Sequence, residues 1–131
     1  MNDKKMKIQQ STFFDHLGMK RQENEDGAVV VSVNVQEIHK DEVGHISSGL
    51  FYTLLDVALG TAVSEQEGGF TATIDLHVQI FKQEQISRLV CKGYHVQMNG
   101  NIGSGRGDVI DENGLLAATG MATFKVTKKA E

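Results

Sequence analysis

The sequence predicts an α+β fold in which an antiparallel sheet wraps around one long central helix. Three observations support this prediction. Apolar and polar residues alternate before position 40, a long run near the middle repeats apolar residues at helical spacing, and alternation returns over the rest of the chain. A period that changes from two to 3.6 and back to two indicates strand, helix and further strands.

Two elements are expected before the long helix. Ser11 to Gly18 (STFFDHLG) has the pattern of a short amphipathic helix, with Ser11 as a candidate N-cap and Gly18 as a candidate C-terminal stop. Ala28 to Glu37 has the alternation of a half-buried strand. Its core face carries Val29, Val31, Val33 and Val35.

The central helix is expected from Ser48 to about Ser64, where alternation stops. Its start is marked by Ser47 and Ser48, whose hydroxyls can cap free backbone N–H groups, and Gly68-Gly69 follows its end. Two sets of apolar residues recur at helical spacing: Leu50, Leu54 and Val57, and Phe51, Leu55, Ala58 and Ala62.

The rest of the chain is expected to form four antiparallel strands in series. TATIDLHVQIF alternates cleanly, and RLVCKGYHVQM, SGRGDVID and LLAATGMATFKV follow it, with hairpin signals at Asn99-Gly100 and Asn113-Gly114. A sheet that wraps a largely apolar helix is the hotdog architecture. In TATIDLHVQIF the expected core side is Ala72, Ile74, Leu76, Val78 and Ile80, and the other side is Thr71, Thr73, Asp75, His77 and Gln79.

Composition and charge limit the function. The 131 residues are 40% hydrophobic and carry a net charge of −4, which suits one globular domain over residues 1–131. There is no basic cluster of the kind that binds nucleic acid, and no window reaches the apolar length of a membrane span. Cys91, the single cysteine, cannot form an intrachain disulfide and is expected to pack within a strand. We expect a cytoplasmic protein with no nucleic-acid or membrane partner.

Asp56 is a carboxylate inside the apolar run GHISSGLFYTLLDVALG. On a helical wheel it shares a stripe with small or polar residues, among them Gly49, Tyr52, Thr53 and Gly60. This stripe is where the helix can leave the core and meet a partner or a ligand. The wheel leaves open whether Asp56 acts in a site or only makes a buried hydrogen bond.

The start of the same helix offers backbone N–H groups to a developing negative charge, such as the oxyanion of a thioester under attack. From Ser48 to Asp56 the helix rises about 12 Å, which is too far for both to act on one carbonyl. If both act on the same carbon, they must come from two subunits, so the spacing predicts an active site at a two-fold dimer interface.

The chain resembles the PaaI-like hotdog thioesterases over roughly Phe13 to Val126. Their pattern is Asn-x-x-Gly-x-x-His-Gly-Gly, six mostly apolar residues and Asp. Here it reads Asp41-x-x-Gly44-x-x-Ser47-Ser48-Gly49, LFYTLL and Asp56. The FFDHLGM opening, the ATIDLHVQIF strand and the final GDVIDENGLLAATGMATFKV segment also match.

The resemblance implies that Asp56 is the catalytic carboxylate, acting as general base on water or as nucleophile. It implies that the N–H of Ser48, with that of Gly49, binds the oxyanion of the other subunit, and that Thr73 helps to place water. It also implies an acyl-CoA substrate, no separate cofactor, and a homodimer that is expected to form a homotetramer. Of the substrate-binding candidates, Asp41 takes the place of an Asn near the thioester, Ser47 takes the place of the His, and Tyr52 lies where the acyl group would pack.

Three of these matches are departures: Ser47 for His, Ser48 for Gly and Asp41 for Asn. A backbone N–H of Ser48 can still donate, but an ionised Asp41 near an oxyanion would repel it unless its carboxylate points away. His45 is two positions too early to replace the family His, and an exposed loop position is expected for it.

Other sites are weaker. The five histidines have no metal-ligand spacing, so no metal is expected. GSGRG at Gly103 to Gly107 lacks the strand-to-helix context of a phosphate loop, and a bulge or a tight edge is expected there. Candidates for contact with the phosphates of CoA are Lys82, Arg88 and Arg106.

Two classes of function remain. The favoured one is an acyl-CoA thioesterase that works through Asp56. The other is a non-catalytic hotdog protein that binds acyl-CoA or a related ligand as a sensor or partner, which the departures at Asp41, Ser47 and Ser48 would suit.

Overall fold

The computed structural model describes residues 12–128 and has one long helix, α2, within that range. In chain order its elements are α1 (Thr12–His16), β1 (Lys20–Glu25), β2 (Ala28–Asn34), the 3-10 turn η2 (Glu37–His39), α2 (Ser48–Glu67), β3 (Gly69–Ile80), β4 (Arg88–Asn99), β5 (Ile102–Asp111) and β6 (Leu116–Lys128). No helix of the described part is long and apolar enough to span a membrane.

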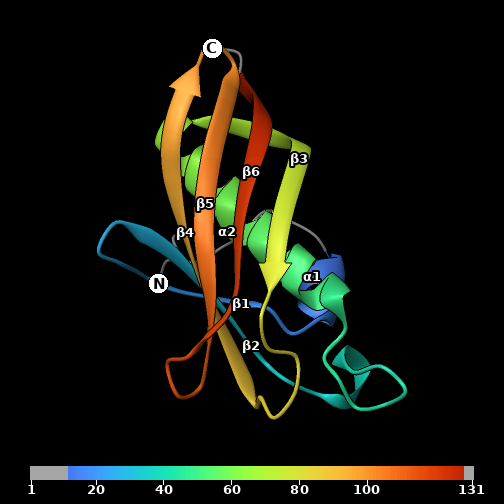
Figure 1. Ribbon diagram of the computed structural model, residues 1–131. Helices are drawn as coiled ribbons and strands as arrows, with labels where there is room; N and C mark the ends of the chain where they lie inside the picture. The colour runs from blue at the N-terminus through green and yellow to red at the C-terminus, as the bar shows by residue number, and fades with distance from the viewer. Residues whose placement is uncertain (1–11, 129–131) are drawn as a thin grey trace.

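The strands form a six-stranded antiparallel sheet in the order β1-β2-β4-β5-β6-β3. The sheet curves around α2, and α1 lies beside the lower end of that helix (Figure 1). This arrangement confirms the predicted α+β class and the wrapping of the helix by the sheet. Helix α2, which carries Asp56, therefore has one side against the sheet and another side that the sheet leaves uncovered.

The order of the strands corrects the expected series. β3 does not pair with β4; it pairs with β6 and lies at the sheet edge, while β4 pairs with β2 and β5. The alternation of a strand identifies its two faces but carries no information about its neighbours, so the series was an assumption of local pairing.

Strand β1 was not predicted at all, because its sequence KRQENE is polar and buries only Arg21. Asp26 and Gly27 join it to β2 with φ values of 50° and 82°, the left-handed conformations that a two-residue hairpin turn needs. β2 is buried on both faces rather than one: Val30 and Ser32 are buried, and the Gln22 side chain on β1 hydrogen-bonds the Ser32 hydroxyl at 2.9 Å. β2 also ends earlier than expected, at Asn34.

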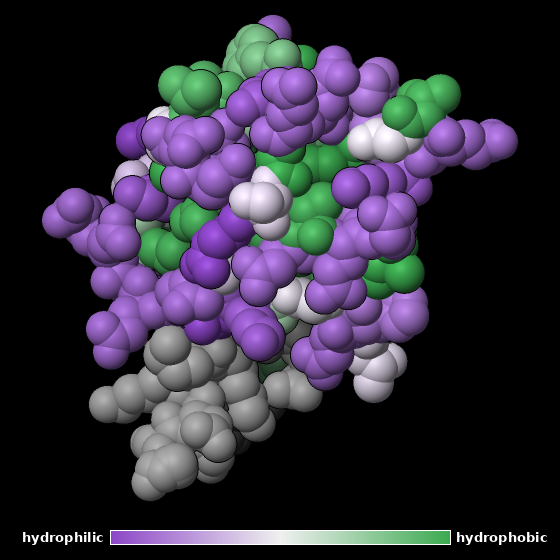
Figure 2. All heavy atoms as spheres, turned by 90° about the horizontal axis from the view of Figure 1, so that it is seen from below, coloured by the Kyte–Doolittle hydropathy of each residue, from purple (hydrophilic) through white to green (hydrophobic). Residues whose placement is uncertain are grey.

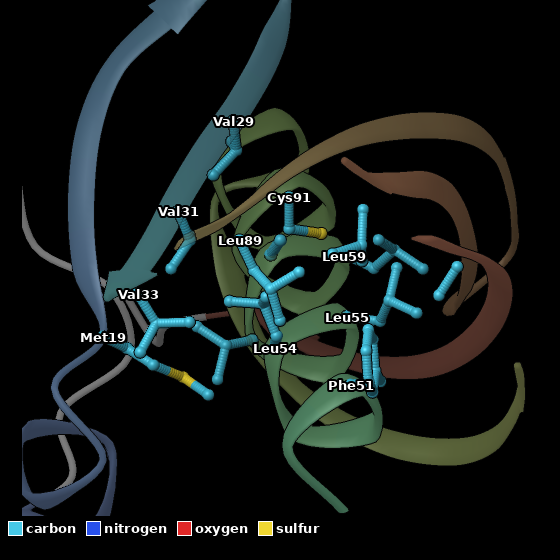
Figure 3. Packing of buried hydrophobic residues seen from close by; sticks show 14 of the residues in the cluster. Met19, Val29, Val31, Val33, Phe51, Leu54, Leu55, Leu59, Leu89 and Cys91 are labelled. Carbon is cyan, nitrogen blue, oxygen red and sulfur yellow. The ribbon is translucent and has the colours of Figure 1, made fainter. Parts of the chain in front are cut away.

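Helix α2 forms the centre of the core. Ser47 is its N-cap, and its hydroxyl accepts the N–H of Gly49 at 3.3 Å. The helix runs to Glu67, three residues beyond the expected end at Ser64, and Gly68 caps it with φ 73°. Figure 3 shows apolar side chains from β2, β4 and α2 pointing toward one another, among them Val31, Cys91 and Leu54. Cys91 is fully buried in this cluster, as predicted, and burial raises the pKa of its thiol well above the usual value.

The glycines of GSGRG have a different role from the one predicted. β5 is a central strand, and a Cβ added to Gly105 or Gly107 would meet Leu59 of α2 at 3.3 or 2.6 Å. On β4, a Cβ at Gly93 would lie 2.9 Å from the backbone of Ala58. These positions need glycine because α2 lies directly on the strands. The bulge in this part of the sheet is on β4, between His95 and Gln97, and not at the glycines of β5.

Strand β3 contains a bulge that reverses the expected faces. Its register against β6 shifts between Thr73 and Asp75, so Ile74 is an extra residue and is 54% exposed. Beyond the bulge, Leu76, Val78 and Ile80 face the core as predicted. Before the bulge the sides are exchanged: Thr73 faces α2, and Ala72 and Ile74, which were expected in the core, are exposed.

The short helix α1 is present as predicted; it ends at His16, and the chain turns at Gly18, which has φ 79°. The proposed N-cap, Ser11, lies outside the described residues. α1 is joined to the segment before α2 through His39, a buried residue whose Nε2–H donates to the carbonyl oxygen of Leu17 at 2.8 Å. The backbone oxygen of His39 accepts the N–H of Ser47 at 2.8 Å, so one residue connects α1 to the start of α2.

The end-on view from below in Figure 2 shows a largely hydrophilic surface that surrounds a smaller apolar area.

The two expected hairpins join β4 to β5 and β5 to β6, with Gly100 and Gly114 at φ 65° and 82°. At the hairpin that precedes β6, the buried carboxylate of Asp111 accepts a hydrogen bond from the Lys82 ammonium at 2.6 Å. That ion pair fastens the β3–β4 connection to the β5–β6 hairpin.

Candidate functional site

A pocket of about 320 Å³ opens beside Asp56, at the junction of α1, α2 and β3. Tyr52 and Thr53 lie on the same stripe of α2 as Asp56, and all three line it. The remaining lining is mostly apolar and comes from α1 and β3: Phe13, Phe14, Thr73 and Leu76. The pocket thus sets one carboxylate among aromatic and aliphatic side chains.

The carboxylate of Asp56 is held by one neighbour. The Thr73 hydroxyl donates to its Oδ1 at 2.6 Å, and the described residues offer no hydrogen bond to its Oδ2. A short hydrogen bond to a carboxylate oxygen fixes its orientation while the second oxygen stays available for a water or an acyl carbon.

The bulge of β3 makes this arrangement possible. Thr73 and Leu76 are three residues apart, and in a regular strand residues at an odd spacing point to opposite faces. The extra residue Ile74 changes that parity, so both side chains face α2 and line the pocket.

The start of α2 lines a second, separate pocket of about 200 Å³. Ser47 and Gly49 take part in it, and Ser48 is exposed at the first helical position. The N–H of Gly49, one of the two expected oxyanion donors, is engaged by the hydroxyl of Ser47. Within this chain, therefore, Asp56, Thr73 and Tyr52 come together, whereas Ser47, Ser48 and Gly49 lie apart from them.

Asp41 turns its carboxylate onto its own loop. Its Oδ1 accepts the N–H groups of Val43 at 3.0 Å and His45 at 2.9 Å, and Gly44 follows in a left-handed conformation with φ 88°. Two backbone donors hold Oδ1 in the turn, so the carboxylate points at its own loop. His45 is a half-exposed loop residue, and its Nε2 lies 3.5 Å from a carboxylate oxygen of Glu84.

Two of the three candidates for contact with CoA phosphates, Lys82 and Arg106, already interact with other side chains. Lys82 pairs with Asp111, which also accepts the N–H groups of Asn113 and Leu115, and these bonds, that of Lys82 first, hold the pKa of Asp111 below its usual value. The Arg106 guanidinium lies 4.6 Å from the ring centre of Tyr94 on the outer face of the sheet. No cluster of three or more His, Cys, Asp or Glu in residues 12–128 is arranged to hold a metal ion.

Three residues that line the pocket were not predicted from the sequence as part of the site: Phe13, Phe14 and Leu76. The available signal was the pair of adjacent aromatic residues, Phe13 and Phe14, in a short predicted helix. A helix this short is not stable alone, so its aromatic side chains are expected to contact other parts of the chain. Leu76 was assigned to the core, and it does pack there while it lines the pocket.

A six-stranded antiparallel sheet around one long helix, with an open pocket at the helix, is the hotdog fold of thioesterase-superfamily proteins. No protein-family model and no curated protein matches the sequence. Among solved structures, a protein of the thioesterase superfamily is 25% identical, covers 89% of this chain and 90% of its own, and superposes with a TM-score of 0.82.

Two further structures are similar at lower identity. A mutant form of the phenylacetic acid degradation protein PaaI from Thermus thermophilus is 23% identical, with coverage of 88% of this chain and 98% of its own and a TM-score of 0.78. A Bacillus halodurans protein, solved with CoA, is 22% identical, with coverage of 93% and 82% and a TM-score of 0.83. At such identities these two establish the fold alone.

Proposed function

We propose that this chain hydrolyses the thioester of an acyl-CoA or a related acyl thioester, with Asp56 as the catalytic carboxylate. The observation that carries the proposal is the carboxylate itself: it stands in an apolar pocket, oriented by Thr73, with one oxygen left for chemistry. The similar structure solved with CoA and the thioesterase-superfamily neighbours support this choice of substrate.

In the proposed reaction, Asp56 either removes a proton from water as the water attacks the acyl carbon, or attacks that carbon itself. In both cases a new C–O bond forms, the C–S bond breaks and the CoA thiolate leaves and is protonated. In the second case water then hydrolyses the acyl-enzyme anhydride and restores the carboxylate. Thr73 is a positioning residue in both routes, because its hydroxyl holds Oδ1.

The oxyanion that forms is proposed to be bound by the start of α2 in a partner copy, through the N–H of Ser48. Along one helix Ser48 and Asp56 are about 12 Å apart, so a single chain does not bring them to one carbonyl. β3 supports a homodimer, because it is an edge strand of 12 residues beside the pocket and exposes Phe70 and Ile74. A homotetramer of two such dimers is part of the proposal.

The test is CoA release from a panel of acyl-CoA substrates, followed with a thiol reagent, for the wild type and for Asp56→Asn. The amide has the shape of the carboxylate but accepts no proton, so activity should fall at least about 100-fold. Equal rates for the two proteins would reject Asp56 as the catalytic group. Light scattering during the same assay tests the dimer, since a fully active monomer is incompatible with a shared site.

A second candidate is a non-catalytic protein that binds an acyl thioester. One observation favours it: the N–H of Gly49 is already used by the Ser47 cap, which leaves fewer donors for an oxyanion. Binding of acyl-CoA by the wild type in calorimetry, with no CoA release from any panel member, would support this reading over the hydrolase.

A further inference from the structure

Two pockets lie side by side near the start of α2, and they share a wall. The larger, of about 320 Å³, contains Asp56, and the smaller, of about 200 Å³, contains Ser47 and Leu50. Phe13 and Thr53 line both of them, so these two side chains separate the pockets.

Of the two shared residues, Phe13 provides the larger barrier. The Thr53 hydroxyl donates to the backbone oxygen of Gly49 at 2.8 Å, so this short side chain lies against its own helix. Phe13 projects from α1, is 53% exposed and has its ring centre 6.0 Å from that of Phe14. An aromatic ring covers far more area than a threonine side chain, so the separation depends mainly on Phe13.

The position of Phe13 is fixed even though α1 has only five residues. A helix this short is not stable alone and must be held by other parts of the chain. The Phe13 carbonyl accepts the N–H of Leu17 at 3.0 Å, and the Leu17 carbonyl accepts the buried His39 ring at 2.8 Å. His39 Nδ1 in turn accepts the N–H of Gln36 at 2.9 Å, so the ring is a neutral tautomer with its proton on Nε2.

We propose that Phe13 is a specificity-determining residue that restricts the acyl group beside Asp56 to a compact one, short or aromatic. With the ring in place, the acyl group has the larger pocket alone, which is at the lower end of the volumes of small-molecule sites. Its lining of Phe14, Tyr52 and Leu76 suits an apolar group of that size. Without the ring, the two pockets become continuous and a longer chain can extend toward Leu50. This inference rests on the proposed function of the same site.

The experiment compares butanoyl-, benzoyl- and dodecanoyl-CoA as substrates of the wild type, Phe13→Ala and Phe13→Tyr. The wild type should have the higher kcat/KM with butanoyl- and benzoyl-CoA. Phe13→Ala should raise the dodecanoyl-to-butanoyl ratio of kcat/KM about tenfold or more, because each methylene accommodated in an apolar site changes discrimination by about tenfold or more. Phe13→Tyr retains the ring and should keep the wild-type ratio.

Phe81→Ala is the matched control, since Phe81 is 59% exposed but lines neither of the two pockets. A ratio for Phe13→Ala within about twofold of the wild-type value, or a wild type that prefers dodecanoyl-CoA, would overturn the proposal. An equal loss of kcat/KM with all three substrates would also overturn it, because that result would show that Phe13 covers the site in general and does not limit the length of the acyl group.

A binding experiment separates failure of this inference about Phe13 from failure of the proposed hydrolysis. If the wild type releases no CoA, the dissociation constants of the thioethers S-butyl-CoA and S-dodecyl-CoA replace kcat/KM. Phe13→Ala should then shift the preference toward the dodecyl compound by about tenfold, with Phe81→Ala unchanged. No shift, or no binding of either thioether by the wild type, would overturn the inference as well.

Discussion

The close contact of α2 with the sheet predicts that Gly93→Ala destabilises the protein. An ideal Cβ at Gly93 would lie 2.9 Å from both the carbonyl carbon and the oxygen of Ala58, and 3.2 Å from its Cβ. Carbon atoms in normal contact are about 3.5–4.0 Å apart. The obstructing atoms are helix backbone, which cannot rotate aside, so α2 must move away from β4 by about half an ångström or more.

Such overpacking costs about 1–3 kcal/mol of the free energy of unfolding. For a chain of 131 residues this corresponds to a fall of roughly 4–12 °C in Tm, measured by circular dichroism or calorimetry. Since Ala58 is two residues from Asp56 on the same helix, the displacement of α2 should also disturb the 2.6 Å hydrogen bond from Thr73 to Asp56 and lower any CoA release.

Gly105→Ala provides a graded comparison, because its nearest neighbours are farther away, at 3.1 Å from the Tyr94 oxygen and 3.3 Å from Leu59. Its Tm should fall less. Gln97→Ala, an exposed position on the same β4 strand, should change Tm by no more than about 2 °C. If Gly93→Ala melts with the wild type, the argument that glycine is required beneath α2 is wrong.

Three further outcomes are expected. Lys82 lowers the folded-state pKa of Asp111, so this carboxylate should stabilise the fold above its unfolded pKa of about 3.9. That stability should be lost as the pH falls through the lower folded pKa. The difference in Tm between the wild type and Asp111→Asn should therefore be constant from pH 7 to 5 and should disappear below about pH 4. Thr73→Val should lower kcat for CoA release by about threefold to tenfold with little change in KM, since it removes one hydrogen bond to Asp56; an unchanged kcat would contradict a positioning role. Cys91 should react with Ellman's reagent far more slowly in the native protein than in 6 M guanidinium, because burial raises its pKa; prompt native reaction would show that the strand opens readily.

The sequence predicted the parts of the fold that depend on local periodicity. The long helix, its cap at Ser47 and the alternating strands after it follow from spacing, and the stripe that holds Tyr52 and Asp56 follows from the helical wheel. Asp26-Gly27 is also a hairpin signal, but the strand before it, KRQENE, is polar and shows no alternation of apolar and polar residues that would predict a strand.

The features that periodicity missed depend on contacts between distant segments. Nothing in TATIDLHVQIF marks Ile74 as an extra residue, since the bulge is defined by pairing with β6. The same holds for the edge position of β3 and for the glycines of β5, whose neighbour is a helix more than 40 residues earlier in the chain. Phe13 could be recognised as aromatic, but only the fold brings it beside Asp56.

The bulge at Ile74 also bears on how this protein could change during evolution. Deleting that one residue would leave Thr73 two positions before Leu76, the spacing at which residues of a regular strand face the same side. Thr73 would therefore still face α2 together with Leu76, Val78 and Ile80, and the carboxylate of Asp56 would keep its hydrogen-bond donor. Closing the bulge without losing a residue would have the opposite effect, because pairing every residue of β3 in one register would turn Thr73 away from Asp56. The site thus tolerates the loss of Ile74 but depends on the bulge for as long as that residue is present.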